Sequence, residues 1–358
     1  MKRASKVKAG VLATGLVLSV LLMTGGASAH VAKKNVVIAE FGGAYSQSIG
    51  NAFATPFSKQ SAYNAQLVDM GDFSSVVQKI EAMVKGHHTQ WDMIELLATW
   101  ENELQVNGVL QKLPAHLRAT LKKVLNPGTV TTWGVGIASY TELITCNRDT
   151  VGRCPQTAKQ FFDTTNFPGR RSLEKDDWLD NCALALEADG VPQTKLFPMD
   201  IARCLRKMAQ LKNKIAVFWT TADQLQQLFR NKEIDMAVGP DGRMWNLVNG
   251  GLNLSLSYKG QLYQTDYFSL LKGAKNTRGA LAFIKWYATH PRAQALFATQ
   301  QVYGVPNPRA YRYIAANVAR HLVDFPANKK QTAPVDYNWV RVHGADAAKQ
   351  WANFLAGG

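Results

Sequence analysis

Long apolar runs are absent from this sequence except near its amino end. The one extended apolar stretch, Val11 to Met23, is about 13 residues long, and a membrane-spanning helix needs roughly 20. Long charge runs, internal repeats and low-complexity segments are missing as well. These absences exclude a repeat architecture and stable membrane insertion, and they predict a soluble globular product.

Motifs of common enzymes and metal sites are also absent. The chain contains no GxSxG, HExxH or P-loop sequence and no CxxC pair, which are typical of hydrolases, zinc proteases, nucleotide-binding enzymes and zinc sites. Carboxylates alone could perform glycosidase chemistry, but no sugar-binding pattern accompanies them. We therefore expect no enzyme, no catalytic residue, no metal site and no cofactor.

Acidic residues are scarce, with 26 Asp and Glu against 41 Lys and Arg. The basic residues are scattered along the chain, so we interpret them as a solvated surface and expect no nucleic-acid partner.

The amino end has the order of a secretory signal peptide. Four basic residues precede the apolar run, and Ala27-Ser28-Ala29 then supplies a small-residue cleavage pattern. We predict a signal peptide over residues 1–29, cleavage near Ala29 and a periplasmic mature chain that begins at His30. An oxidising compartment favours disulfides among the four cysteines. From their spacing we predict the pairs Cys146–Cys154 and Cys182–Cys204 among three possible connectivities.

Apolar periodicity predicts alternating strands and helices. Strands are expected at 35–39, 67–68, 92–97, 133–138, 143–145, 171–173, 215–219, 235–239 and 252–258. Helices are expected at 45–57, 76–84, 178–187, after 199, at 222–231, 280–287 and 291–298. This order is typical of α/β proteins with parallel sheets, and the chain length favours two domains.

A series of short motifs resembles the family 1 extracellular solute-binding proteins of ABC importers, and within them the spermidine/putrescine-binding branch. The resemblance runs from about Val36 to Phe354. Its carriers are FGGAY at 41–45, WDMI at 91–94, CNRD at 146–149, NFPGRR at 166–171, ALAL at 183–186, DMA at 235–237, GPDG at 239–242, DYF at 266–268, KGAKN at 272–276 and YGVPN at 303–307.

The resemblance implies a two-lobed periplasmic-binding-protein fold, type II-like, with a ligand cleft between lobes joined by crossing hinge segments. The first lobe would comprise 30–140 and 266–308, and the second 141–265 and 309–358. The protein would capture a small polyamine-like solute and deliver it to an inner-membrane permease. The alternative is the same fold binding a small organic anion or amino acid derivative, or presenting its ligand to a sensor.

Acidic residues are the first candidates for ligand binding. By the resemblance, Asp177, Asp180 and Asp266 would hold ligand ammonium groups, because burying an organic cation without a partner is costly. Other interpretations stay open: Asp177 and Asp180 could cap a helix, and Asp266 could form a hinge salt bridge.

Aromatic residues are the second candidates, since rings attract cations. They are Phe41, Tyr45, Trp100 and Tyr303, although Tyr45 also fits a helix core. Two further candidates come from the motifs: Gly43, whose backbone N–H suits an anion, and Asp241. The chain departs from the polyamine branch at Pro240 and Gln264, which match two tryptophans of that branch's aromatic box. Their loss leaves a shorter amino compound or amino acid derivative open as the ligand.

Overall fold

The computed structural model describes residues 33–357. The predicted signal peptide and the start of the mature chain lie outside the described residues. Within the described part, no helix has both the length and the apolar character needed to cross a bilayer.

The first lobe is built on a mixed sheet in the order β2-β1-β3-β11, in which the central strands β1 and β3 bury apolar residues such as Ile38 and Met93. Strands β1 and β2 are parallel, as are β1 and β3, whereas β11 is antiparallel to β3 and to β5. The strands are β1 (Lys34–Glu40), β2 (Tyr63–Asp69), β3 (Met93–Leu96), β4 (Leu110–Gln111), β5 (Gly134–Tyr140), β11 (Leu262–Leu271) and β12 (Ala333–Pro334).

Helices cover this sheet by burying one apolar face each. The predicted helix at 45–57 is present as three consecutive segments: α1 (Gly43–Ile49), the π-helical η1 (Gly50–Ala54) and α2 (Thr55–Gln60). The other helices of this lobe are α3 (Val76–Lys85), α4 (Ala98–Val106), α5 (Ala115–Leu121), α11 (Thr277–Thr289) and α12 (Pro291–Gln301).

The second lobe has a five-stranded sheet in the order β10-β6-β9-β7-β8. Its strands are β6 (Glu142–Asn147), β7 (Arg171–Glu174), β8 (Ile215–Trp219), β9 (Met236–Pro240) and β10 (Leu254–Ser257). The helices around it are α6 (Ala158–Phe162), α7 (Trp178–Ala188), α8 (Ile201–Lys212), α9 (Ala222–Arg230), α10 (Asp241–Asn249) and the long α15 (Tyr337–Ala356).

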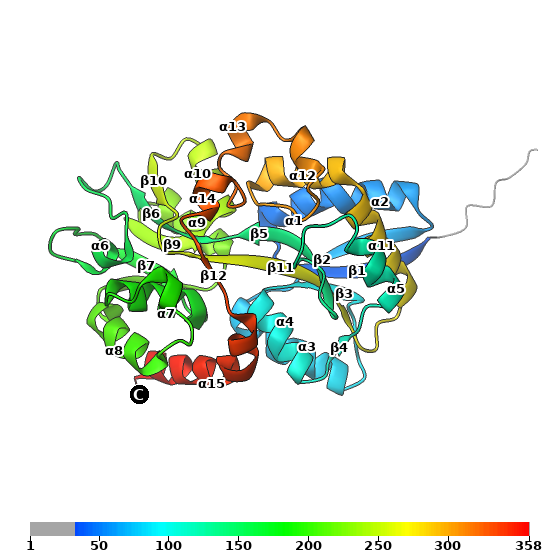
Figure 1. The fold of residues 1–358 in the computed structure, drawn as a ribbon, viewed down its shortest axis with the longest axis horizontal. Coiled ribbons are helices and arrows are strands. Elements are labelled where there is room, and N and C mark those ends of the chain that lie inside the picture. The colour runs from blue at the N-terminus through cyan, green and yellow to red at the C-terminus, as the bar shows by residue number, and fades with distance from the viewer. Residues whose placement is uncertain (1–32, 358) are drawn as a thin grey trace, which may run out of the picture. The chain divides into compact units, whose positions relative to one another are not determined.

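The chain passes between the two lobes at three places. Thr141 alone separates β5 from β6, and residues 258–261 separate β10 from β11. The third passage follows α12 and leads through β12 to α15, which packs on α4 as well as on α7 and α8 (Figure 1). The predicted limits of the lobes, at 140, 266 and 308, stay a prediction, and β12, from the segment predicted for the second lobe, pairs with β11.

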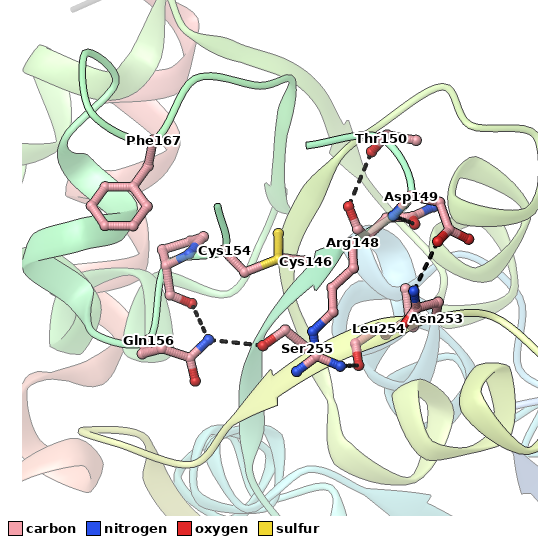
Figure 2. The surroundings of a disulfide bond; sticks show 12 residues. Cys146, Arg148, Asp149, Thr150, Cys154, Gln156, Phe167, Asn253, Leu254 and Ser255 are labelled. Atoms are coloured by element: carbon pink, nitrogen blue, oxygen red, sulfur yellow. Dashed lines mark hydrogen bonds between the residues drawn. A yellow bond between two sulfur atoms is a disulfide. The ribbon is translucent and has the colours of Figure 1, made fainter. Parts of the chain in front are cut away.

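Both predicted disulfides are present. Cys146 of β6 joins Cys154 in the following loop, with a Cα separation of 5.6 Å, and Cys182 of α7 joins Cys204 of α8 at 5.1 Å. Figure 2 shows that Gln156, beside the first disulfide, also donates a hydrogen bond to Ser255 of β10 at 2.8 Å. The first crosslink therefore ties a loop to the sheet of the second lobe, the second joins two helices of that lobe, and both restrict the unfolded chain.

Candidate functional site

A cavity lies where the strand ends of the two lobes meet. Its lining includes Glu174 at the end of β7, Trp219 at the end of β8 and Pro240 at the end of β9. The first lobe contributes Phe41 just after β1, Tyr140 of β5, and Gln264 and Asp266 of β11. Ligands of open α/β sheets bind at the carboxyl ends of strands, so this interlobe cavity, about 60 Å³ in volume, is the candidate site.

Five carboxylates line the interlobe cavity: Glu142, Glu174, Asp177, Asp180 and Asp266. Asp177 is the N-cap of α7, where its Oδ1 accepts hydrogen bonds from the backbone N–H groups of Leu179 and Asp180. The capping interpretation of Asp177 is therefore confirmed, and the same residue also faces the cavity.

Two of these carboxylates are buried with a free acceptor. Asp180 accepts a hydrogen bond from Gln264 at Oδ2, at 2.6 Å, while its Oδ1 has no partner within residues 33–357. The Oδ1 of Asp266 also has no partner there, and Asp266 forms no ion pair with a described residue, so the hinge salt bridge is absent. Buried acceptors without donors are costly, and a ligand N–H group would satisfy them.

Burial and mutual repulsion raise the pKa values of these acids. Burial, followed by the charge of Asp177, raises the pKa of Asp180 well above its ordinary value. Burial and the charge of Asp180 do the same for the pKa of Glu142, and burial raises the pKa of Asp266. A cation in the cavity would favour the ionised forms, so its binding would release protons.

The first lobe contributes an aromatic wall to the cavity. Phe41, Tyr45, Tyr140 and Tyr303 all line it. The ring of Tyr45 meets those of Phe41 and Tyr303 at centroid distances of 5.6 and 6.1 Å, and its hydroxyl donates to the buried Glu95. Tyr45 is thus both a core residue and a residue of the cavity, which is consistent with its two interpretations.

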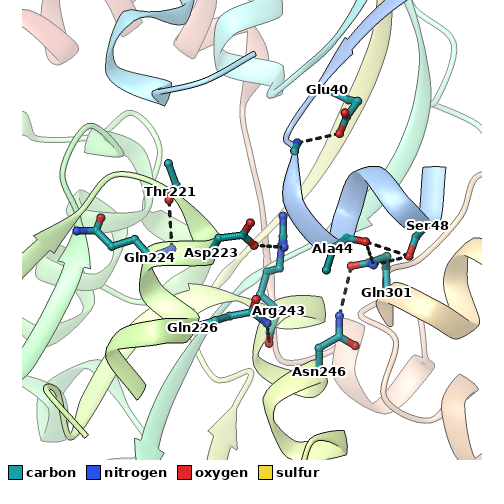
Figure 3. Close-up of polar contacts among 11 residues, drawn as sticks. Glu40, Ala44, Ser48, Thr221, Asp223, Gln224, Gln226, Arg243, Asn246 and Gln301 are labelled. Carbon is teal, nitrogen blue, oxygen red and sulfur yellow. Dashed lines mark hydrogen bonds and ion pairs between the residues drawn. The ribbon is translucent and has the colours of Figure 1, made fainter. Parts of the chain in front are cut away.

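Arg243 is the one cation that lines the cavity within the described chain. Its side chain is 3% exposed, and its Nη1 donates to Asp223 at 2.7 Å (Figure 3). The guanidinium makes no other hydrogen bond to residues 33–357. Because a guanidinium has five N–H donors, most of its capacity remains available for an anionic group.

Three predicted residues lie outside this lining. Trp100 lines an adjoining cavity instead. Gly43 lies against the second lobe, where a Cβ would be 1.8 Å from a carboxylate oxygen of Asp223. Asp241 is fully buried, and its Oδ1 accepts from the N–H of Gly242. A ligand-binding role for these three stays a prediction.

The sequence analysis missed Glu142, Glu174, Tyr140 and Arg243. Glu142 and Glu174 could have been noticed, because each is the single acid of its strand: Glu142 is the first residue of β6 and Glu174 the last of β7. Pro240 and Gln264, identified as departures from the polyamine branch, do line the cavity. No cluster suited to a metal ion occurs in the part of the chain that the structure describes.

Comparisons with known proteins agree with this geometry. A family model described as bacterial extracellular solute-binding protein matches residues 52–322. The gamma-aminobutyric acid-binding protein of Pseudomonas aeruginosa is 26% identical over 345 residues, which cover 95% of this chain and 96% of that protein.

Solved structures confirm the two-lobed periplasmic-binding-protein fold. A binding protein of Agrobacterium tumefaciens R10 in complex with agropinic acid has a TM-score of 0.81 and 26% identity, over 91% of this chain and 99% of that one. A GABA receptor structure has a TM-score of 0.80 and 28% identity, over 91% and 98%. A spermidine/putrescine-binding protein of Streptococcus pneumoniae, at 15% identity and a TM-score of 0.67 over 90% and 100%, shares the fold alone.

Proposed function

The chain belongs to the bacterial extracellular solute-binding proteins, and from this premise we propose that it binds a small zwitterion with separated ammonium and carboxylate groups, similar to γ-aminobutyrate. The observation that carries the proposal is the opposition of charges in one cavity. Five carboxylates and the guanidinium of Arg243 line the same space. A diamine would leave Arg243 facing a like charge, and a simple anion would face the carboxylates.

Each end of the ligand has its own partners in this proposal. The ammonium lies among Asp177, Asp180 and Asp266, where the two unpaired Oδ1 atoms accept its hydrogen bonds. The carboxylate lies against Arg243, whose planar fork suits bidentate pairing. The alkyl segment between them packs on the rings of Phe41 and Tyr45, which line the same cavity.

Names of similar proteins support an amino acid derivative over a polyamine. The Pseudomonas protein and one of the similar structures are named for γ-aminobutyrate, and another was solved with agropinic acid. We propose further that residues 1–29 direct export to the periplasm, and that the loaded protein delivers its solute to an inner-membrane permease.

A set of three matched ligands tests the proposal. γ-Aminobutyrate carries both charged ends, putrescine replaces the carboxylate with a second ammonium, and butyrate lacks the ammonium. We expect the melting temperature of residues 30–358 to rise with γ-aminobutyrate, because a ligand at one hundred times its Kd stabilises the fold by about 2.7 kcal/mol. A rise with putrescine alone would restore the polyamine hypothesis, and a rise with butyrate alone would favour an organic anion.

A further inference from the structure

Two residues of α9 hold Arg243 from outside the interlobe cavity, whose lining includes neither of them. The carboxylate of Asp223 accepts a hydrogen bond from Nη1 of the guanidinium at 2.7 Å (Figure 3). The buried side chain of Gln226 donates to the backbone carbonyl of Arg243 at 3.0 Å. Asp223 and Gln226 are three positions apart and therefore lie on one face of α9. This face fixes both the backbone and the guanidinium of Arg243.

The ion pair with Asp223 determines which donors of Arg243 remain free. Within residues 33–357, Asp223 is the only ion-pair partner of Arg243. The guanidinium also lies over the ring of Tyr45 from the first lobe, with Cζ 5.5 Å from the ring centroid. A long side chain without a partner would sample many rotamers. The pair at Nη1 restricts this freedom and leaves Nη2 and Nε for a ligand carboxylate, in the planar arrangement that bidentate pairing needs.

Asp223 also contacts the first lobe, where α1 begins. Gly43 has a φ of 59° there, and a methyl group added at its Cα would collide with Oδ2 of Asp223. Only a glycine hydrogen leaves room for this approach, and glycine adopts a positive φ without steric cost. The carboxylate of Asp223 is thus confined between Arg243 of its own lobe and the backbone of the opposite lobe, although its side chain is 46% exposed. This contact exists only while the two lobes are together.

The place of Asp223 in the first turn of α9 has a simpler explanation, because the helix dipole favours an acid there whatever it contacts. The contacts with Arg243 and Gly43 go beyond that explanation. We propose that Asp223 is a positioning residue, which orients the guanidinium of Arg243 toward the ligand carboxylate and is itself held in place by the first lobe at Gly43. Preference for a carboxylate then depends on the lobes being together. This inference rests on the proposed function and adds a residue that determines its specificity.

The test compares γ-aminobutyrate with 4-aminobutanol, which keeps the ammonium and replaces the carboxylate with a hydroxyl. Calorimetry gives the ratio of the two affinities. We expect Asp223→Ala to lower this ratio about tenfold while 4-aminobutanol binds as to the wild type, which also shows that the variant is folded. Asp223→Asn keeps an oxygen acceptor for Nη1 and should retain most of the ratio. Asp189→Ala is the control, because Asp189 pairs with Arg203 at 2.6 Å, is similarly exposed at 38%, and lies outside the cavity lining.

A second variant tests the contact with the first lobe. Gly43→Ala places a methyl group against the carboxylate of Asp223 and should lower the affinity ratio as Asp223→Ala does. Gly71→Ala is its control, because Gly71 also has a positive φ, of 88°, but no atom lies within 4 Å of the added methyl group. An unchanged ratio in Asp223→Ala, or equal losses in Asp223→Ala and Asp223→Asn, would overturn the positioning role, while γ-aminobutyrate binding by the wild type upholds the proposed function. An unchanged ratio in Gly43→Ala would overturn the part assigned to the first lobe.

A wild-type protein that does not bind γ-aminobutyrate would overturn both the positioning role and the proposed function.

Discussion

The two walls of the interlobe cavity differ in kind. The wall from the second lobe is acidic, with Glu142, Glu174, Asp177 and Asp180. The wall from the first lobe is mainly aromatic, and Asp266 of β11 is its one acid among the described lining residues. Charge recognition is thus concentrated on one lobe, while the other lobe supplies rings that exclude water from the ligand.

This division suggests how binding and closure are coupled. The attraction between a bound cation and the acids is weak in water, because exposed charge pairs are screened. It becomes much stronger once the opposite wall excludes the solvent. The rings of the first lobe therefore add their contribution only when the lobes are together. Contacts already cross between the lobes, as Asn246 of α10 donates to Gln301 of α12 at 3.3 Å (Figure 3).

Breaking the acidic wall should have the largest effect on affinity. Asp177→Asn removes a negative charge but keeps the cap of α7, because asparagine is an equally good N-cap. We expect γ-aminobutyrate to bind about 30-fold more weakly by calorimetry, corresponding to ~2 kcal/mol for a charged hydrogen bond.

Asp200→Asn is the matched control for this change. Asp200 caps α8 in the same way, accepting from the N–H of Arg203 at 2.8 Å, and does not line the cavity. Its affinity should equal that of the wild type. Equal losses in both variants would mean that helix capping, and not charge at the cavity, determines binding.

Weakening the aromatic wall should have a smaller effect. Phe41→Leu keeps part of the apolar contact of Phe41 with its neighbours but removes the ring face on which the alkyl segment of the ligand packs, an apolar contact worth about 1 kcal/mol. We expect a loss of about fivefold in affinity. Phe162→Leu, at a half-buried ring of α6 that lies outside the cavity, controls for the general cost of the substitution. A loss larger than that of Asp177→Asn would reverse the assigned roles of the two walls.

Much of the fold could be predicted from local patterns, but parts of the site could not. The buried strands and the helix N-cap at Asp177 follow from short-range periodicity and from the preference of aspartate for caps. The helix α15 was not predicted, although Asp336 caps it and Val340, Ala347 and Trp351 place one apolar face toward the core. This helix could have been predicted, because these three apolar residues are seven and four positions apart, as on one face of a helix.

Arg243 shows what the sequence could not reveal. It stands just after β9, at the start of α10, and it faces the cavity only because the end of β9 lies at the same sheet edge as the end of β7 and the start of β6. Strand order depends on contacts between segments far apart in sequence, which periodicity does not encode. The resemblance supplied Asp266 and Asp180, but it assigned no role to Arg243.

A buried acid away from the cavity should leave affinity unchanged and alter stability alone. Glu101 of α4 lies in the first lobe, accepts hydrogen bonds from Thr131 and Ser269 at 3.0 and 3.2 Å, and has its pKa raised by burial to about 7. Because the folded pKa exceeds the ordinary value of 4.5, its stabilising contribution is complete below pH 4.5 and is lost as the pH rises through 7.

Glu101→Gln imitates the protonated acid and should abolish this pH dependence, without touching the interlobe cavity. Without ligand, the variant should become more stable relative to wild type as the pH rises. The difference in the free energy of unfolding, measured by urea titration, should change by on the order of 3 kcal/mol between pH 4.5 and pH 8. γ-Aminobutyrate affinity should stay within about twofold, since distant sites act independently. Parallel stability profiles for both proteins would show that Glu101 is ionised in the fold. A large loss of affinity would instead show that ligand binding also depends on residues of the first lobe outside the cavity lining.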